Sequence, residues 1–110
     1  MSHPNLYLVG NAGTGWGIPQ DLHKFTMKAG NPNLFELDIT LNPGEFKILS
    51  AENYDDYTLR PVTASAPVTD DRMQANKGGE DLKWVIKDGE GGHYKITLDV
   101  YKMKIKFEKQ

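Results

Sequence analysis

LFELDITL, residues Leu34–Leu41, is the stretch of the sequence that decides the fold. Apolar and polar side chains alternate along it. The apolar ones share one face of an extended chain, and they are Phe35, Leu37, Ile39 and Leu41. Acidic and hydroxyl side chains share the other face. A period of two indicates a β-strand with one face buried and the other in solvent.

The segments on both sides of this stretch also have strand character. The turn signal GNPN (residues 30–33) precedes it, and the turn signal NPGE (residues 42–45) follows it. Beyond the second turn, Glu45–Leu49 (EFKIL) is a short strand that we expect to pair with Leu34–Leu41 as a hairpin. Before the first turn, His23–Ala29 is predicted to be a strand.

The rest of the chain continues this pattern. Strands are predicted at Asn5–Gly10, Leu82–Lys87, Gly92–Asp99 and Lys102–Glu108. In the last two, the side chains expected to face the core are Tyr94, Ile96, Leu98, Met103, Ile105 and Phe107. Ser50–Asp81 is polar and weakly periodic, so we expect mostly loops with one or two short edge strands. About eight short strands and no sustained helical period indicate an all-β sandwich.

Size and composition define the class of protein. The chain has 110 residues, which suits one domain with one core. Its net charge of −2 gives no electrostatic reason to expect binding to nucleic acid or to an anionic membrane. It contains no cysteine, which excludes disulfides, thiolate metal sites and cysteine nucleophiles.

No segment is predicted to span a membrane, because no apolar run approaches the roughly 20 residues that a spanning helix needs. The first ten residues, MSHPNLYLVG, lack the long apolar stretch of a signal peptide. We therefore expect this chain to be part of a longer precursor.

Signatures of catalysis or of metal binding are weak. The three histidines, His3, His23 and His93, are isolated and lack metal-ligand spacing. Carboxylates lie mostly in polar turns, and the sequence has no G-x-S-x-G motif. We therefore predict a protein that is not an enzyme and that uses no metal or cofactor.

Leu6–Gln20 (LYLVGNAGTGWGIPQ) passes from a strand into a glycine-rich loop, as phosphate-binding loops do. The Walker pattern requires Lys and then Ser or Thr after its second glycine, but Trp16 and Gly17 occupy those positions. The dinucleotide-binding pattern fails as well, since Ile18 replaces its third glycine and no helix is predicted to follow. We interpret the glycines as a loop between strands.

Trp16 is the unusual residue of that loop. Its neighbours are Gly15 and Gly17, so it has no local side chain to pack against. It either folds over the end of the sandwich and caps the core, or stays exposed as a flat platform; we favour the platform. Large exposed aromatic side chains often mark binding sites. Sugars suit such a platform because their axial C–H faces are apolar while their rims carry hydroxyls.

Two further segments contain candidate ligand contacts. ENYDDYTLRP (residues 52–61) contains Tyr54 and Tyr57, followed by Arg60, which can donate charge-assisted hydrogen bonds to sugar hydroxyls. Each tyrosine has the alternative of packing at a strand end. NKGGEDLKW (residues 76–84) contains Asp81 and Lys83, which either contact a ligand or belong to a solvated turn. Trp84, which shares a face with Leu82 and Ile86, is predicted to lie in the core.

Three sequence blocks together resemble a known family. They are LYLVGNAGTGW, NPNLFELDITLNPGEFKIL and LKWVI followed by GHYKITLDVYKMKIKF. Their order resembles that of the starch-binding repeats of the SusE/SusF outer-membrane lipoproteins of gut Bacteroidetes, and of related modules in pullulanase-type enzymes. The similarity covers nearly the whole chain.

The resemblance implies an immunoglobulin-like, antiparallel β-sandwich that holds starch-like α-glucan without cleaving it. It implies that residues 1–110 are one carbohydrate-binding domain of a larger lipoprotein, anchored by lipid at the extracellular face of the outer membrane. Its partners would be the glucan and other proteins of a surface glycan-uptake complex. The alternatives are a structural spacer without a sugar site, or binding of a different glycan.

The resemblance also implies particular site residues. Two aromatics would form an arc that matches the curve of an α-1,4-linked glucan, and polar side chains would hold the sugar O2 and O3 hydroxyls. Trp16 matches the tryptophan of the family's GW loop, and Tyr54 or Tyr57 corresponds to the second aromatic. Arg60 and Lys83 are similar to polar positions near the site. With Asp81, the predicted carbohydrate-binding residues are therefore Trp16, Tyr54, Tyr57, Arg60, Asp81 and Lys83.

Overall fold

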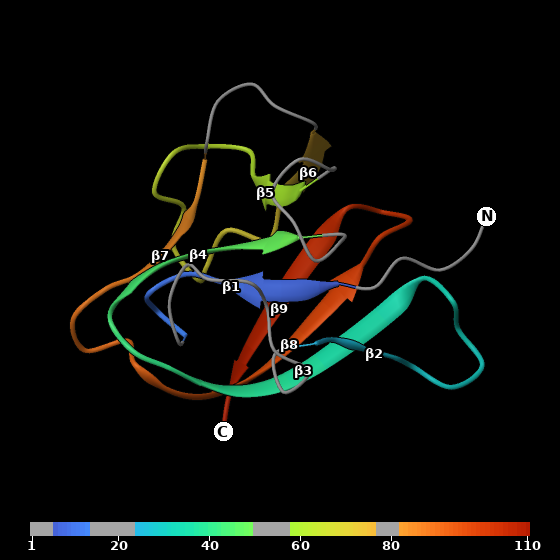
Figure 1. Cartoon of the computed structure of the whole chain (residues 1–110), viewed down its shortest axis with the longest axis horizontal. Coiled ribbons are helices and arrows are strands. Elements are labelled where there is room, and N and C mark those ends of the chain that lie inside the picture. Colours follow the sequence, from blue (N-terminus) through green and yellow to red (C-terminus); the bar gives the residue numbers. More distant parts are fainter. Residues whose placement is uncertain (1–5, 14–23, 50–57, 77–81) are drawn as a thin grey trace.

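The computed structural model describes residues 6–13, 24–49, 58–76 and 82–110, and this part of the chain is all-β (Figure 1). It contains nine strands: β1 (Tyr7–Val9), β2 (Thr26–Met27), β3 (Leu34–Leu41), β4 (Gly44–Leu49), β5 (Thr58–Pro61), β6 (Met73–Asn76), β7 (Trp84–Ile86), β8 (Gly92–Asp99) and β9 (Lys104–Lys109). Every strand ladder is antiparallel. The predicted all-β class is therefore confirmed.

The strands form two sheets. The four-stranded sheet has the order β2-β3-β8-β9, and its longest ladder joins all eight residues of β3 to β8. The five-stranded sheet has the order β1-β4-β5-β6, and β7 pairs with the first half of β4. The two sheets enclose one hydrophobic core, as in a β-sandwich.

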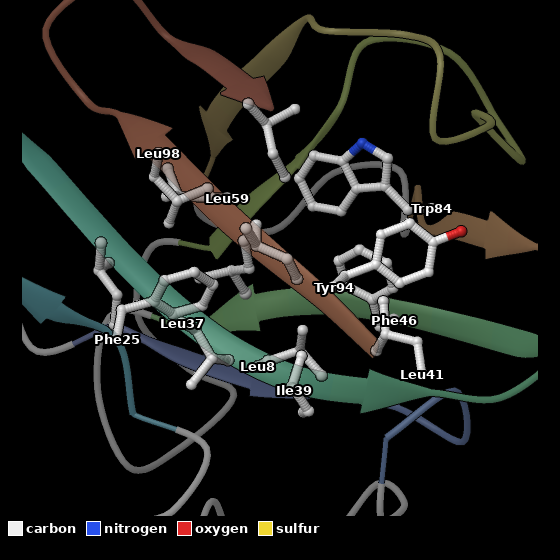
Figure 2. Packing of buried hydrophobic residues seen from close by; sticks show 14 of the residues in the cluster. Leu8, Phe25, Leu37, Ile39, Leu41, Phe46, Leu59, Trp84, Tyr94 and Leu98 are labelled. Carbon is white, nitrogen blue, oxygen red and sulfur yellow. The ribbon is translucent and has the colours of Figure 1, made fainter. Parts of the chain in front are cut away.

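The core is built from the alternation seen in the sequence. All four apolar side chains of β3 are buried, as are Tyr94, Ile96 and Leu98 of β8. From the other sheet, Trp84 and Phe46 stack with their ring centroids 5.2 Å apart (Figure 2). Trp84 is 0% exposed, so its predicted place in the core is confirmed. Of the three C-terminal residues expected in the core, Ile105 is buried, while Met103 and Phe107 are half-buried and pack against the core.

The predicted hairpin between Leu34–Leu41 and Glu45–Leu49 is wrong. β3 pairs with β2 and β8, whereas β4 pairs with β1, β5 and β7, so the chain changes sheets between Leu41 and Gly44. Proline fixes φ near −65°, which prevents Pro43 from entering the type I′ turn that a two-residue hairpin favours. The crossing is held instead by the end of β1. Asn11 Oδ1 accepts a hydrogen bond from the amide of Glu45 (2.7 Å), and the amide of Asn42 donates to the carbonyl of Ala12 (2.8 Å).

The region predicted as mostly loops, Ser50–Asp81, contains two short strands within the described residues 58–76, as expected. β6 is the last strand of its sheet, in agreement with the prediction. β5 is not an edge strand, because Leu59 is paired with Ile48 on one side and with Ala75 on the other.

Gly10, directly after β1, packs closely against the backbone of β4. Its φ is +138°, and a Cβ placed on it would lie 2.1 Å from the carbonyl oxygen of Glu45 and 2.5 Å from Cα of Phe46. Both are backbone atoms of β4, so a side chain at this position would separate the two strands. This glycine therefore has a packing role within the sandwich.

We expect Gly10→Ala to destabilise the fold by about 3–5 kcal/mol, because it combines a backbone clash with a disfavoured φ. Urea unfolding followed by circular dichroism measures the loss. Gly30→Ala is the matched control: its φ is +80° but a Cβ there meets nothing within 4 Å. It should cost only about 1 kcal/mol. Equal losses for the two variants would contradict this explanation.

Candidate functional site

The structure describes two of the six predicted carbohydrate-binding residues. Arg60 lies on β5, and Lys83 directly precedes β7. The other four lie outside the described residues, and they are Trp16, Tyr54, Tyr57 and Asp81. The part of the candidate site that the structure describes therefore consists of Arg60, Lys83 and the strands around them.

Arg60 belongs to the outer face of the five-stranded sheet, the face opposite the core. Alternation along β1, β4 and β5 gives this outer face six residues: Tyr7, Val9, Lys47, Leu49, Thr58 and Arg60. Lys47 is half-buried and the other five are buried, including a small hydrophobic cluster of Tyr7, Val9 and Leu49. Outer faces of antiparallel sandwich sheets are commonly solvated and polar. This one is shielded from solvent, which is the pattern of a surface with a specific role.

Arg60 is a buried cation with a defined hydrogen-bond geometry. Arg60 is only 5% exposed. Its Nε and Nη2 donate hydrogen bonds to Thr58 Oγ1 at 3.0 and 2.6 Å. Thr58 is two residues earlier on the same strand, so strand geometry places both side chains on one face. A buried charge is costly unless hydrogen bonds satisfy it, and the threonine hydroxyl supplies one such acceptor.

The register brings Arg60 and Lys83 to the same stretch of β4. β5 pairs Leu59 with Ile48, and β7 pairs Trp84 with Phe46. Arg60 follows Leu59 and Lys83 precedes Trp84, so both strands end their pairing with β4 next to Lys47. Because their neighbours all face the core, these two residues and Lys47 belong to the opposite side. The sequence contained no direct sign of this proximity, since 23 positions separate Arg60 from Lys83.

One end of the five-stranded sheet is the meeting point of several chain segments. The ladders align Tyr7 with Leu49, Leu49 with Thr58, and Thr58 with Asn76. Tyr7 also forms a bridge with Lys24. We call these five residues the end row: Tyr7, Lys24, Leu49, Thr58 and Asn76. Four of them directly flank the segments 14–23, 50–57 and 77–81, in which the remaining predicted site residues lie.

Sequence reasoning did not select Tyr101 as a candidate site residue. Tyr101 is 78% exposed, more than any other large hydrophobic residue among those that the structure describes. It lies in the turn between β8 and β9. The signal that could have found it is an aromatic residue within a short turn, two positions after an aspartate that can bond the turn's amides.

The described residues were also compared with the requirements of metal sites and membrane spans. Among them, no group of three or more histidine, aspartate or glutamate side chains is placed to hold a metal ion. Nowhere in this part of the chain is there a helix with the length and apolar content needed to cross a membrane. His93 lies with Nδ1 3.4 Å from Thr40 Oγ1, on the outer face of the four-stranded sheet.

No protein-family model, curated protein or solved structure matches this chain. The resemblance to the SusE/SusF repeats therefore stays a prediction that rests on the three sequence blocks. Its coarsest consequence, a β-sandwich of antiparallel strands, agrees with the two sheets of the structure.

We expect Thr58→Val to destabilise the protein by about 1–3 kcal/mol, because valine keeps the shape of threonine but removes an acceptor of the buried guanidinium. Chemical unfolding measures the loss. The matched control is Thr26→Val in β2, where the threonine is exposed and should change stability by less than about 0.5 kcal/mol. If Thr58→Val were as stable as the wild type, Thr58 would not be an important partner of Arg60.

An ion pair lies just before β6. Arg72 donates to Asp70 twice through its side chain, with Nε–Oδ1 and Nη2–Oδ2 both 3.0 Å, and once through its backbone amide. These hydrogen bonds, together with the positive charge of Arg72, lower the pKa of Asp70 below its ordinary value of 3.8. The same pairing raises the pKa of Arg72.

A lowered folded-state pKa means that this pair stabilises the protein above the unfolded-state pKa, about 3.9. The stabilisation is lost as the pH falls through the lower folded-state value. We therefore expect Asp70→Asn to be less stable than the wild type at pH 7 and the difference to shrink at acid pH. Urea unfolding from neutral to acid pH measures it. In an Arg72→Gln background, Asp70→Asn should produce a smaller pH dependence, because the backbone amide at position 72 still donates to Asp70. A difference between Asp70→Asn and the wild type that stays constant with pH would contradict this account.

Proposed function

We propose that this domain binds starch-like α-glucan without cleaving it, through an aromatic platform next to the end row. Trp16 and one of Tyr54 and Tyr57 supply the platform. Arg60, Lys83 and Asp81 supply polar contacts to sugar hydroxyls. The proposal combines the resemblance of the sequence with the arrangement of the strands that flank these residues.

The observation that carries the proposal is the convergence of separate segments at the end row. Tyr57 directly precedes Thr58, and Tyr54 is three residues further back. Asp81 is five residues beyond Asn76, and Trp16 is eight residues before Lys24. The strand ends at Lys24, Leu49, Thr58 and Asn76, which adjoin these segments in the sequence, therefore meet at one end of the sheet.

The chemistry of Arg60 fits a sugar site that is organised before the ligand arrives. A guanidinium has five N–H donors in a fixed plane, and hydrogen bonds from a charged donor are stronger than neutral ones. Thr58 holds this group in place, which reduces the entropy lost on binding. Because Arg60 is buried, we propose that it forms the floor of the site beneath the aromatic residues.

The wider role that we propose is glycan capture at a bacterial cell surface, within a longer lipoprotein held at the outer membrane by a lipid anchor elsewhere in that protein. An open platform buries only part of a flexible sugar, so one domain would bind with modest affinity. Repeated domains, or partner proteins in a glycan-uptake complex, would raise the overall avidity.

Isothermal titration calorimetry with maltoheptaose tests the proposal. We expect saturable binding that weakens at least about tenfold in Trp16→Ala, which corresponds to about 1.4 kcal/mol. Comparing Tyr54→Ala with Tyr57→Ala identifies the second platform residue, because only the tyrosine that contacts sugar should weaken binding. Met27→Ala is the control, since it removes a side chain that is 40% exposed from the other sheet and should leave affinity unchanged.

Three results would contradict the proposal. Absence of binding to both maltoheptaose and insoluble starch would favour the spacer, in which this domain separates or contacts neighbouring domains. Binding unchanged by Trp16→Ala and by both tyrosine variants would mean that the sugar site lies elsewhere on the molecule. Release of reducing ends from maltoheptaose by the purified protein would show that it is an enzyme.

A further inference from the structure

An open groove of about 420 Å³ lies on the outer face of the four-stranded sheet, where polar and charged groups flank apolar side-chain surface. Its lining residues are Asp71, Thr97, Asp99, Lys104, Ile105 and Lys106. One wall forms because the segment before β6 pairs with the start of β9. The amide of Ile105 donates to the carbonyl of Asp71 (2.9 Å), and the amide of Met73 donates to the carbonyl of Met103 (3.2 Å). Its size is within the usual range of small-ligand sites, about 300–1,000 Å³.

The charges of the groove balance. Two carboxylates, Asp71 and Asp99, face two ammonium groups, Lys104 and Lys106, and Lys104 Nζ lies 3.7 Å from Asp71 Oδ1. With no net charge, the groove has little electrostatic attraction for an anion or a cation. It does offer hydrogen-bond donors and acceptors side by side, and the hydroxyl of Thr97 can act as either. That combination suits a neutral ligand with many hydroxyl groups.

Tyr101 lies in the turn that joins β8 to β9, two residues after Asp99 and three before Lys104, both of which line the groove. The turn is held by its own hydrogen bonds. Asp99 Oδ1 accepts from the amides of Tyr101 (3.0 Å) and Lys102 (2.9 Å). The amide of Val100 donates to the carbonyl of Asn33 in the neighbouring β2–β3 turn (2.9 Å). An exposed aromatic ring is therefore presented on an ordered backbone, which lowers the entropy cost of binding.

We propose that Tyr101 and this groove form a saccharide-binding site for neutral oligosaccharides, additional to the site at the end row. The ring of Tyr101 stacks on the apolar face of one sugar unit. Asp71, Thr97, Lys104 and Lys106 bind hydroxyls of the adjoining unit. The inference takes its ligand class from the proposed function but uses none of the same residues, so either site can exist without the other.

A saccharide fits this surface better than a protein partner does. Specific protein interfaces bury about 1,200–2,000 Å² and have a fully desolvated centre rich in apolar side chains. Here one exposed aromatic side chain accompanies a small groove, and the outer faces of β8 and β9 carry lysines, acids and threonine. Aromatic stacking combined with polar contacts to a rim of hydroxyls needs no larger apolar area.

The experiment is a ¹H–¹⁵N correlation titration of the protein with maltoheptaose and, separately, with cellohexaose. We expect at least one of them to shift the amide signals of residues 97–106 and of Asp71. Tyr101→Ala should weaken the binding reported by these signals at least fivefold. Tyr101→Phe, which keeps the ring, should bind nearly as well as the wild type. Lys104→Ala tests the polar wall and should also weaken binding.

Trp16→Ala separates this inference from the proposed function. Groove signals that still shift in Trp16→Ala and are weakened in Tyr101→Ala support the additional site, whatever happens at the end row. Shifts that avoid residues 97–106 and depend on Trp16 overturn the additional site and leave the proposed function intact. Absence of shifts with both sugars overturns both. Groove shifts seen only with oligogalacturonate, an anionic probe, overturn the assignment to neutral saccharides.

Discussion

The fold depends on the crossing of the chain from one sheet to the other between Leu41 and Gly44. Asn11 Oδ1 binds the amide of Glu45, and the carbonyl of Ala12 binds the amide of Asn42, so the end of β1 fixes the point where the chain turns away from β3. If β3 and β4 formed a hairpin, they would share one sheet. Because they do not, Phe46 faces the apolar side of β3 across the core, and the domain has two separate outer faces.

The two outer faces differ in a way that follows from their side chains. The five-stranded sheet has a buried outer face, with Tyr7, Val9 and Leu49 clustered beside Arg60. The four-stranded sheet carries exposed charges there, and Glu36 pairs with Lys95 at 3.1 Å, which raises the pKa of Lys95. Exposed ion pairs contribute little stability, so this second face adds solubility and polar contacts. Among the described residues, the buried charge is that of Arg60, and it lies on the first face.

Side-chain periodicity predicted the strands but not their partners. The limits of Leu34–Leu41 and Gly92–Asp99 could be found from the sequence because alternation continues over eight residues. Trp84 could be placed in the core because it shares a face with Leu82 and Ile86. Pairing depends on long-range contacts such as that of Asn11 with Glu45, which no local pattern encodes. The burial of Arg60 was equally hidden, since its polarity predicts exposure. Tyr101 was overlooked because its presentation depends on hydrogen bonds that the turn's amides donate to Asp99 Oδ1 and to the carbonyl of Asn33.

The position of the two proposed sites limits how a glycan could use both. The end row belongs to the five-stranded sheet and the groove to the four-stranded sheet, so the sites are on faces that point away from each other across the core. A short oligosaccharide that stacks on Tyr101 cannot lie flat on both faces. Two sites on one domain would therefore hold two chains, or two distant parts of one long chain. Such an arrangement raises avidity for a polysaccharide far more than for a short oligosaccharide, because only the polysaccharide presents a second segment at high local concentration.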